Sequence, residues 1–378
     1  MALHLLLEGL MAEGDPAMEE VCPTVDRLAA HGDTGRLFLC QGERLPEEGG
    51  CWFTYFGQQQ GVREADLPTG FFAALGAGLA PDPQQTWAML SFTNLYRKQD
   101  KLLFLSPLRT GQSVEECQAL ADGLAEEFAA EGWQVITHPH STTLFCHSSQ
   151  RFNVRTTPLA ILEGEDSFIH LPTGEDYRPI HQLLTIGQLL MARHPVNTTR
   201  KLAGRLPLNT PWLQGIAPGP AMMVTGKKQG VCWCQDLLVA GLAKAAGMRV
   251  NLLPEGEALP ALPLDEIADQ AAHGLAVVHL QGPAVLARHQ MTTERLELLA
   301  RMDQEIFSTL GQELATRQTS LTLITPSPLT AKGLGSNAPA CWLTVEGKAM
   351  GKDRRFWNRR RFGEGELLDM GALTDRWQ

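Results

Sequence analysis

Histidine and cysteine side chains gather in one short stretch of the chain, with a spacing that could serve a metal ion. His138 and His140 stand two residues apart, and Cys146 and His147 follow a few residues later. On strands, His138 and His140 would share a face, and a hairpin could bring His147 alongside them in a geometry that could bind zinc. The alternative is a set of polar side chains on an exposed sheet, and we favour this alternative.

Cys232 and Cys234 are the closest pair among the eight cysteines. On a helix, side chains two residues apart point about 200° away from each other, so a helical pair cannot bind one ion. We therefore interpret both as buried structural thiols rather than as metal or redox ligands. The scattered spacing of the other cysteines favours reduced thiols and a cytoplasmic location.

Two basic segments could bind anions. The first, residues 226–230, is a basic glycine turn placed before a predicted helix whose N-terminus could hold an anion, but it lacks the spacing of an ATPase loop. The second segment consists of Lys352, Arg354, Arg355, Arg359, Arg360 and Arg361, with Phe356 and Trp357 between them. It is either a patch for an anion, a nucleic acid or a partner, or a solvated segment whose arginines pair with nearby carboxylates. We favour the solvated segment.

Length and composition narrow the class of protein. The chain has 378 residues, which is enough for about two domains, and 44% of them are hydrophobic. The net charge of −10 argues against general nucleic-acid binding. The apolar start is interrupted by Glu8 and has no basic residue before it, so it indicates a buried strand rather than a signal peptide. No apolar run approaches the roughly 20 residues of a membrane span.

Short apolar strands alternate with amphipathic helices over much of the chain, which is typical of an α/β domain with a mainly parallel sheet. We expect strands at residues 2–7, 36–40, 249–253, 275–280 and 321–325, and helices at 23–31, 237–246, 265–272 and 292–315. The continuous apolar character of residues 2–7 predicts a strand that is covered on both faces.

The middle of the chain has a different pattern. Ser113 and Glu116 can form a capping box at the start of a helix that runs to residue 130. Alternating strands are expected around this helix, at residues 133–137, 142–147 and 159–163. This combination predicts an inserted, smaller α+β cap domain at 96–204, with a half-exposed antiparallel sheet, and a core domain formed by 1–95 and 205–378.

A set of segments occurs in a recognisable order along the chain. They are a strand ending in Glu8-Gly9, the segments 23–29, 70–74, 194–197 and 241–248, the strand with Val278-His279, and the helix with Asp303. Together they resemble the archaeal-type, 2,3-bisphosphoglycerate-independent phosphoglycerate mutases of the alkaline phosphatase superfamily. This resemblance implies an alkaline-phosphatase-like core, with a mainly parallel sheet sandwiched by helices. It also implies an isomerase family whose phosphoryl transfer uses two divalent metals and a serine nucleophile.

The chain departs from this family at the first metal ligand and at the nucleophile. The family's first-strand aspartate corresponds to Glu8, whose extra methylene shifts the carboxylate. The family's proline-glycine-serine-aspartate sequence corresponds to a stretch that contains Glu48 but no serine, and no serine precedes Ser91. Cys51 is the nearest thiol, but neighbouring carboxylates would oppose the formation of its thiolate.

The later metal ligands and the substrate clamps depart from the family as well. Where the family has an aspartate and a histidine four residues apart, the chain has Ala284 and Arg288. No Asp or His occurs from Gln304 to Lys352, where the second metal cluster is expected. The phosphate-clamping arginines of the family correspond to Thr69 and Met89, which cannot replace a guanidinium.

We therefore expect a catalytically inactive homologue, a pseudoenzyme without a cofactor, that acts by binding a protein partner or a phosphorylated small molecule. No membrane contact is expected, and self-association is compatible with the sequence. The alternative is a metal-dependent phosphoglycerate mutase or phosphatase with rewired ligands, using Mn or Zn. It requires Glu8, Glu48, His279 and His289 to meet within about 2–2.5 Å of one ion, and His289 could take part only after a shift of its loop.

Overall fold

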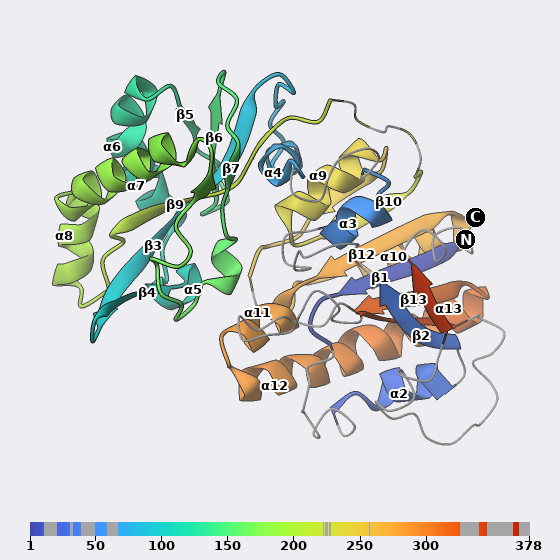
Figure 1. The fold of residues 1–378 in the computed structure, drawn as a ribbon. Coiled ribbons are helices and arrows are strands. Elements are labelled where there is room, and N and C mark those ends of the chain that lie inside the picture. The colour runs from blue at the N-terminus through green and yellow to red at the C-terminus, as the bar shows by residue number, and fades with distance from the viewer. Residues whose placement is uncertain are drawn as a thin grey trace. The chain divides into compact units, whose positions relative to one another are not determined.

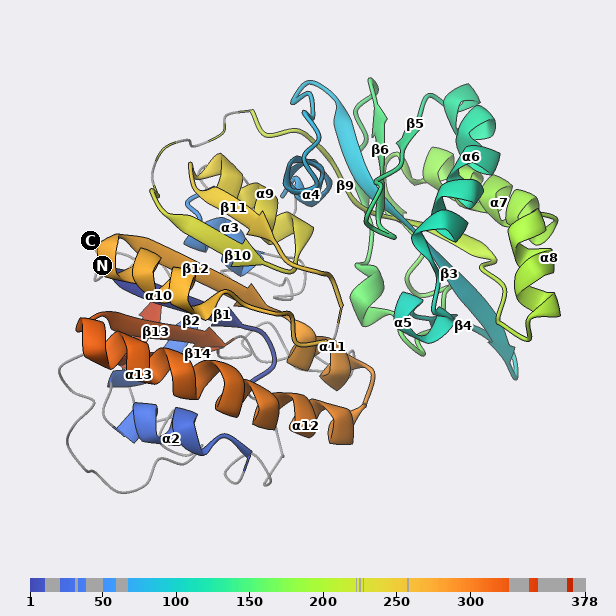
Figure 2. The same ribbon diagram turned by 180° about the vertical axis from the view of Figure 1, so that it is seen from behind.

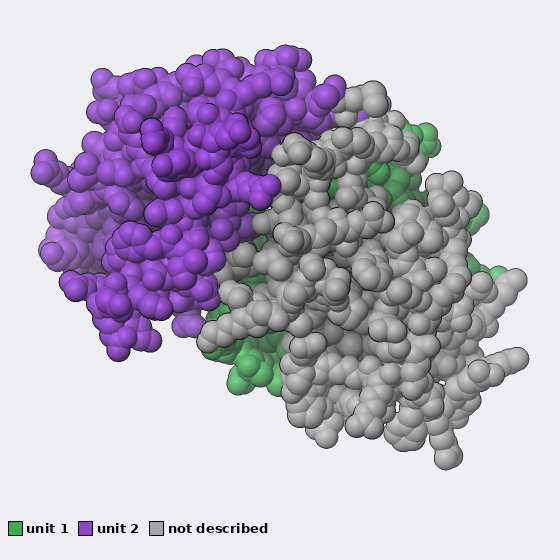
Figure 3. Space-filling view, viewed as in Figure 1, with its two compact units in different colours: residues 1–60, 224–378 green, residues 61–223 purple. Residues whose placement is uncertain are grey.

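The protein was studied as a computed structural model, which describes residues 1–10, 21–30, 33–38, 50–58, 67–221, 223, 226, 228–256, 258–325, 340–345 and 366–369. The chain divides into two compact units (Figure 3). Unit 1 comprises Met1–Gln60 and Val224–Gln378, and unit 2 comprises Gly61–Met223. Glu48 and the basic segment 352–361 lie outside the described residues.

Unit 1 is built on a sheet with the strand order β11-β10-β12-β1-β13-β14-β2-β15. The strands are β1 (Ala2–Leu7), β2 (Asp33–Phe38), β10 (Val231–Cys234), β11 (Arg249–Leu252), β12 (Leu275–Leu280), β13 (Ser320–Thr325), β14 (Ala340–Val345) and β15 (Glu366–Asp369). The first five strands in this order are parallel to one another. β14 is antiparallel to both β13 and β2, and β15 is parallel to β2.

Helices cover both faces of this sheet (Figure 1 and Figure 2). They are α2 (Pro23–Ala30), α3 (Gly50–Tyr55), α9 (Leu237–Ala245), α10 (Leu264–His273), α11 (Gly282–Arg288), α12 (Thr292–Met302), a π-helical turn (Asp303–Phe307) and α13 (Ser308–Arg317). α3 and α9 lie over one face, and α10, α12 and α13 lie over the other. Because both faces of β1 are covered, the strand is apolar at nearly every position, as the sequence predicts.

Alternation along β1 divides its side chains between the two faces. Leu3, Leu5 and Leu7 belong to the same core as buried residues of α10, α12 and α13. His4 therefore points to the opposite face, where its Nδ1 lies 2.6 Å from the hydroxyl of Tyr55 in α3. His279 of β12, the register partner of Leu6, lies on this same second face.

Unit 2 is an α+β unit. Its main sheet has β4 (Lys101–Leu105), β3 (Thr86–Lys98), β6 (Leu144–Ser148) and β5 (Gln134–Ile136) in this order, with β9 (Thr210–Pro218) also paired to β3. A small second sheet pairs β7 (Val154–Arg155) with β8 (Thr173–Gly174). The helices are α4 (Thr69–Gly76), α5 (Pro107–Thr110), α6 (Val114–Ala130), α7 (Tyr177–Ala192) and α8 (Pro195–Leu202). The predicted capping box of Ser113 and Glu116 is present at the start of α6.

The bounds of unit 2 differ from the predicted insert at 96–204. All five strands of the main sheet are antiparallel neighbours, and β3 pairs with β9 from Thr86 to Thr93. The predicted insert at 96–204 leaves out most of β3 and the whole of β9. Both strands belong to the antiparallel sheet of unit 2. The pairing therefore places both strands in unit 2.

Three local assignments from the sequence were wrong. Cys232 and Cys234 lie on β10, where alternation places both thiols on the same face, rather than on a helix. Residues 226–230 precede this strand and not a helix N-terminus. The predicted strand at 159–163 contains a short 3-10 helix, Leu159–Ile161, instead. Among the described residues, no helix is long and apolar enough to cross a membrane.

Candidate functional site

The carboxyl ends of two neighbouring parallel strands bring the first candidate residues together. Glu8 follows the last residue of β1, and His279 is the penultimate residue of β12, which pairs with β1. Arg288 is the last residue of α11, the helix that follows β12. Ligands of open α/β sheets bind at this edge, because the loops that follow the strands meet there. The structure thus places three sequence-predicted positions at one edge of the sheet.

The carboxylate of Glu8 accepts hydrogen bonds on both oxygens. His279 Nε2 lies 3.0 Å from Glu8 Oε1, and Trp52 Nε1 donates to the same oxygen over 3.1 Å. Arg288 Nη2 donates to Glu8 Oε2 over 3.3 Å. The indole of Trp52 also meets the ring of His279 edge-on, with centroids 5.6 Å apart. The carboxylate is therefore fully engaged, and one of its partners is a permanent cation.

This arrangement determines the charge of Glu8. Burial alone would raise the pKa of the Glu8 carboxyl. Three neighbours outweigh burial and lower this pKa to about 2: His279 through its hydrogen bond and charge, Arg288 through its charge, and Trp52 through its hydrogen bond. Asp236 behaves in the opposite way: its burial raises its pKa, the Glu8 charge adds to the rise, and His279 opposes it. Asp236 is the N-cap of α9, where it accepts from Val239 N over 2.9 Å. Glu8 is thus ionised at neutral pH.

The hydrogen bonds also assign the proton of His279. Since the Glu8 carboxylate can only accept, the imidazole must donate through Nε2, and its Nδ1 is then an acceptor when the ring is neutral. His279 Nδ1 and Arg288 Nε are both buried, and neither has a hydrogen-bond partner among the described residues. We call Glu8, His279, Arg288 and Trp52 the Glu8 cluster. Within this cluster, Nδ1 of His279 and Nε of Arg288 could each make a further hydrogen bond.

The turn after β1 fixes Glu8 relative to α11. Gly9 has a φ of 80°, and a Cβ at this position would lie 2.6 Å from Ala284 Cα and 2.8 Å from Pro283 C. Only glycine allows this close approach of two backbones. Arg295 of α12 donates to the Gly9 carbonyl from both Nε and Nη2, over 3.2 and 3.0 Å. These contacts hold the start of α11, and hence Arg288, against the end of β1.

Among the described residues, few side chains around Glu8 could hold a divalent metal. Ala284 offers no ligand atom, and its backbone packs against Gly9. His289 is the buried C-cap of α11 and has no contact with Glu8 among those that the structure gives. No group of three His, Cys, Asp or Glu side chains within the described ranges is placed to hold a metal ion. The guanidinium of Arg288 instead supplies the positive charge that Glu8 faces.

The two predicted clamp positions come together in unit 2. Gly215 of β9 has a φ of 65°, and a Cβ there would collide with Thr69 Oγ1 and lie 3.3 Å from Met89 Cε. Thr69 at the start of α4 and Met89 in β3 therefore meet around this glycine. Both side chains are uncharged, so this point offers no phosphate clamp of the kind that two guanidinium groups would form.

The histidine group considered for zinc is not brought together as predicted. β5 ends at Ile136, so His138 and His140 lie in a turn and share no strand face. His138 Nε2 lies 3.2 Å from a backbone carbonyl, and His147 stacks on Trp87 with ring centroids 4.9 Å apart. Cys146 is fully buried on β6, so the exposed sheet that the sequence analysis favoured is wrong for this strand.

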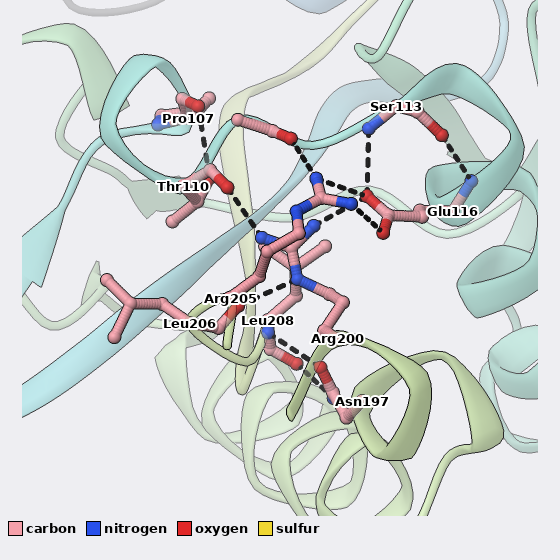
Figure 4. Close-up of polar contacts among 10 residues, drawn as sticks. Pro107, Thr110, Ser113, Glu116, Asn197, Arg200, Arg205, Leu206 and Leu208 are labelled. Atoms are coloured by element: carbon pink, nitrogen blue, oxygen red, sulfur yellow. Dashed lines mark hydrogen bonds and ion pairs between the residues drawn. The ribbon is translucent and has the colours of Figure 1, made fainter. Parts of the chain in front are cut away.

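Unit 2 holds a second carboxylate with arginine partners (Figure 4). Arg200 Nη1 lies 2.5 Å from Glu116 Oε2, and Arg205 Nη1 lies 2.9 Å from Glu116 Oε1. Arg200 also donates to the carbonyls of Thr110 and Leu206, so each of its three nitrogens has an acceptor. This Glu116 cluster, meaning Glu116, Arg200 and Arg205, ties α6 to α8 and to the loops beside them. Its role is structural.

Two members of the site were missed in the sequence. Trp52 has no motif around it that marks it as a donor to Glu8. Asp236 could have been found, because it lies two residues after the end of β10 and caps the next helix, as ligand-binding residues of α/β sheets often do. The wrong helical assignment of Cys232 and Cys234 concealed this position.

Sequence comparison relates the chain to one kind of enzyme. No protein-family profile matches it. A 2,3-bisphosphoglycerate-independent phosphoglycerate mutase from Methanosarcina acetivorans is 22% identical over 332 residues, which is 82% of this chain and 80% of the relative. The mutase of the same name from Methanosarcina mazei is 24% identical over 58% of this chain and 59% of its own length. A probable mutase of this kind from Geobacter sulfurreducens is 29% identical over 32% of this chain and 33% of its own length.

Structure comparison agrees on the fold. The PH0037 protein from Pyrococcus horikoshii superposes with a TM-score of 0.66 at 14% identity, covering 99% of this chain and 95% of its own. The cofactor-independent phosphoglycerate mutase from Thermoplasma acidophilum gives a TM-score of 0.50 at 14% identity, with 100% and 98% covered. The α/β fold, with five neighbouring parallel strands in its main sheet and a separate antiparallel sheet, matches the fold of these proteins.

Proposed function

Because the chain is a distant homologue of the archaeal-type 2,3-bisphosphoglycerate-independent phosphoglycerate mutases, we propose that it is a member without mutase chemistry. In this proposal, the guanidinium of Arg288 takes the place of the catalytic metal. The protein then acts by binding, on an alkaline-phosphatase-like core with unit 2 as its inserted cap.

The observation that carries the proposal is the pairing of Arg288 with Glu8. The family resemblance expects a histidine, a neutral metal ligand, at position 288. Arginine at this position is itself a cation, and it contacts Glu8 Oε2 over 3.3 Å. A divalent ion at the same carboxylate would lie beside the guanidinium and be repelled by it. In this proposal, the negative charge of Glu8 is balanced by the Arg288 side chain and not by a bound ion.

The remaining features of the site agree with a loss of phosphoryl transfer. Since no serine precedes Ser91, the family's nucleophile has no counterpart in the sequence. Thr69 and Met89 are uncharged at the positions of the phosphate clamp, and Arg288 is committed to Glu8. A phosphorylated ligand would therefore find little positive charge at these positions. This favours a protein partner over a phosphorylated metabolite as the bound molecule.

Metal content of the purified protein tests the proposal. The chain is incubated with manganese and with zinc, desalted, and measured by mass spectrometry. We expect almost no retained metal. One or two retained equivalents would overturn the proposal and support a metal-dependent mutase or phosphatase with rewired ligands.

A matched set of variants makes the test sharper. The triple variant E8D/A284D/R288H restores the ligand types that the resemblance expects, and it should retain metal that the wild type does not. R288M removes the guanidinium without adding a ligand and serves as the control. If R288M alone retained metal as well as the triple variant, the remaining wild-type side chains would be sufficient for binding. Circular dichroism of each variant verifies that the fold is kept.

A further inference from the structure

The dipeptide His-Pro occurs twice in unit 2, beginning at His138 and at His194. In both places Nδ1 of the histidine accepts from the backbone N–H two residues later. His140 N lies 3.2 Å from His138 Nδ1, and Val196 N lies 3.3 Å from His194 Nδ1. Proline has no N–H and keeps the residue before it extended, as in His194 with φ −71° and ψ 138°. The two turns therefore have the same local structure.

The other ring nitrogen of each histidine contacts a helix. His138 Nε2 lies 3.2 Å from the carbonyl oxygen of Ala77, the C-cap of α4. The ring of His194 is hydrogen-bonded to the carbonyl of Ala119 in α6. Gly123 makes room for this ring, because a Cβ there would lie 2.8 Å from His194 Nε2. Both turns are thus joined to neighbouring helices through their imidazoles.

The two turns attach to adjacent residues of α6. Gln118 Nε2 donates to the His138 carbonyl over 3.2 Å, and the carbonyl of the next residue, Ala119, accepts from His194. His194 is also the N-cap of α8, where its Nδ1 satisfies a backbone N–H that has no partner within the helix. The first half of α6 and the start of α8 therefore depend on the same pair of turns.

These hydrogen bonds require neutral imidazoles. Each ring accepts through Nδ1 and donates to a carbonyl through Nε2, which is possible only for the neutral tautomer with its proton on Nε2. Protonation adds a hydrogen to Nδ1, which can then no longer accept from the backbone N–H of His140 or Val196. Both rings are half-buried, so protons can reach them from solvent.

The surroundings of both rings agree with this assignment. Burial lowers the pKa of His138, the bond to Ala77 opposes this change, and the neighbouring His140 lowers the pKa further. Burial also lowers the pKa of His194, and the bond to Ala119 offsets only part of it. In both cases the folded chain favours the neutral ring.

Charged groups on the surrounding elements leave this balance unchanged. α4 carries none, and the last turn of α7 carries none. The titratable side chains on the remaining elements are Glu115, Glu116, Cys117, Asp122, Glu126 and Glu127 of α6, Arg193 beside His194, and Arg200 and Lys201 of α8. Glu116 is paired with Arg200, and the other four carboxylates of α6 are exposed to solvent, which screens them.

We propose that the two His-Pro turns form an acid-sensitive switch in unit 2. While both imidazoles are neutral, the turns hold the first half of α6 and the start of α8. Protonation takes the acceptor from two backbone N–H groups, and both helix segments then open more often. Because the pKa values of both rings are lowered, this contribution to stability is present above their ordinary value of 6.5 and is lost as the pH falls through the lowered values. The switch does not depend on the Glu8 cluster.

The tautomers of the two rings in the wild-type chain give the first test. NMR spectra of protein with isotope-labelled histidine show which ring nitrogen carries the proton, and H138N and H194N assign the two signals. We expect both rings to carry it on Nε2 at pH 7.5 and to titrate with midpoints below 6.5. A proton on Nδ1 of either ring at pH 7.5, or a midpoint at or above 6.5, would overturn the proposal.

Hydrogen exchange measures the loosening of the helices. Rates are corrected for the intrinsic effect of pH and compared at pH 7.5 and pH 5, a range in which Glu8 stays ionised. We expect the first turn of α8 to exchange about fivefold faster at pH 5, the factor that corresponds to loss of an ordinary N-cap. Residues 114–123 of α6 should follow with a smaller increase. Unchanged rates in both segments would contradict the switch.

The double variant H138N/H194N separates the switch from a general effect of acid. The asparagine oxygen can accept from the N–H two residues later, as it does in helix caps and turns, and it carries no charge at either pH. The acid response should therefore disappear. H181N is the matched control: His181 Nε2 lies 2.8 Å from the carbonyl oxygen of Pro172, a bond that a ring donates in either protonation state, so the acid response should stay.

An acid response of H138N/H194N equal to that of the wild type would refute the proposal. Circular dichroism at pH 7.5 verifies that each variant is folded. If the double variant does not fold, the tautomers and midpoints of the wild-type chain still decide the question.

Discussion

Glu8 in unit 1 and Glu116 in unit 2 are both largely buried carboxylates that pair with arginine, but their surroundings differ. The Glu116 cluster uses every nitrogen of Arg200, whose side chain is 0% exposed, and adds Arg205 at the surface. The Glu8 cluster leaves His279 Nδ1 and Arg288 Nε buried without a hydrogen-bond partner within the described residues. One cluster is complete, and the other is not.

The difference shows that arginine can pair with a largely buried carboxylate in a fully hydrogen-bonded cluster or in one that leaves polar atoms without partners. Buried polar networks that serve only stability are usually satisfied throughout, because each unpaired group costs about 1–3 kcal/mol. The Glu8 cluster contains two such unpaired groups, His279 Nδ1 and Arg288 Nε, and it lies at the strand edge where α/β folds bind ligands. Under the proposed function, Arg288 balances the charge of Glu8 in place of a metal ion.

The largest effect is expected from E116Q. This substitution leaves the Arg200 guanidinium buried without its counter-charge, and breaking a buried ion pair in this way costs about 3–5 kcal/mol. Denaturant unfolding, with hydrogen exchange of α6 and α8 as a local readout, measures the loss. R205Q is the matched control: because the Arg205 side chain is 41% exposed, its loss should cost no more than about 1 kcal/mol. Equal effects of the two variants would refute the structural role given to Arg200.

The second-largest effect is the contribution of Glu8 to the pH dependence of the free energy of unfolding. Its pKa of about 2 in the folded chain is below its ordinary value of 4.5, so its contribution is present above pH 4.5 and is lost as the pH falls toward 2. The contribution is about 3 kcal/mol. In E8Q this part of the dependence disappears. The free energy of unfolding, measured from pH 5 downward for both proteins, should therefore fall more steeply in the wild type. Parallel curves would show that Glu8 is not specially stabilised as a carboxylate.

A smaller effect is expected from R288M at pH 7. Trp52 and His279 still donate to Glu8 in this variant, so only one charge-assisted hydrogen bond is lost, which is worth about 1.5–3 kcal/mol. The pKa of Glu8 should rise because the neighbouring positive charge is gone, and titration of its carboxylate by NMR measures this rise. If R288M destabilised the chain as much as E116Q does, the two clusters would be equivalent and the comparison would fail.

The smallest effect is expected from W52F. The ring remains, but the hydrogen bond from Nε1 to Glu8 Oε1 is lost, at about 1–2 kcal/mol. W212F is the matched control in unit 2, because Trp212 Nε1 donates to the neutral carbonyl of Thr157 over 2.8 Å. Unfolding experiments on both variants should show the larger loss for W52F, since its acceptor is charged. A larger loss for W212F would contradict this assignment.

Much of the fold could be predicted from local patterns. The apolar run of β1, the capping box of α6 and the apolar strands β12 and β13 are each encoded within a few residues. The long helix predicted at 292–315 is also present, although a π-helical turn interrupts it at Asp303–Phe307. Asp303 accepts from the backbone of Thr24 there, a partner 279 residues away that no local pattern can reveal.

The candidate site was predicted only in part. The family resemblance identified Glu8, Ala284 and Arg288 as departures from the expected metal ligands, because Glu8 is a longer carboxylate, Ala284 has no ligand atom and Arg288 is a cation. That Arg288 would contact Glu8 depends on the close packing of Gly9 against α11, which is a tertiary feature. The contributions of Trp52 and Asp236 depend on the same three-dimensional arrangement. Glu48 and the basic segment 352–361 remain sequence predictions.

The central place of β1 in its sheet has a consequence for synthesis of the chain. β1 leaves the ribosome before the other described strands of its sheet, and its two neighbours, β12 and β13, begin only at Leu275 and Ser320. At about 5–20 residues per second, the apolar segment waits about 15–55 s for β12 to be made. Unit 2, which is continuous from Gly61 to Met223, is complete before then. We expect unit 2 to fold first, while the nascent N-terminus stays bound to a chaperone until the last third of the chain arrives.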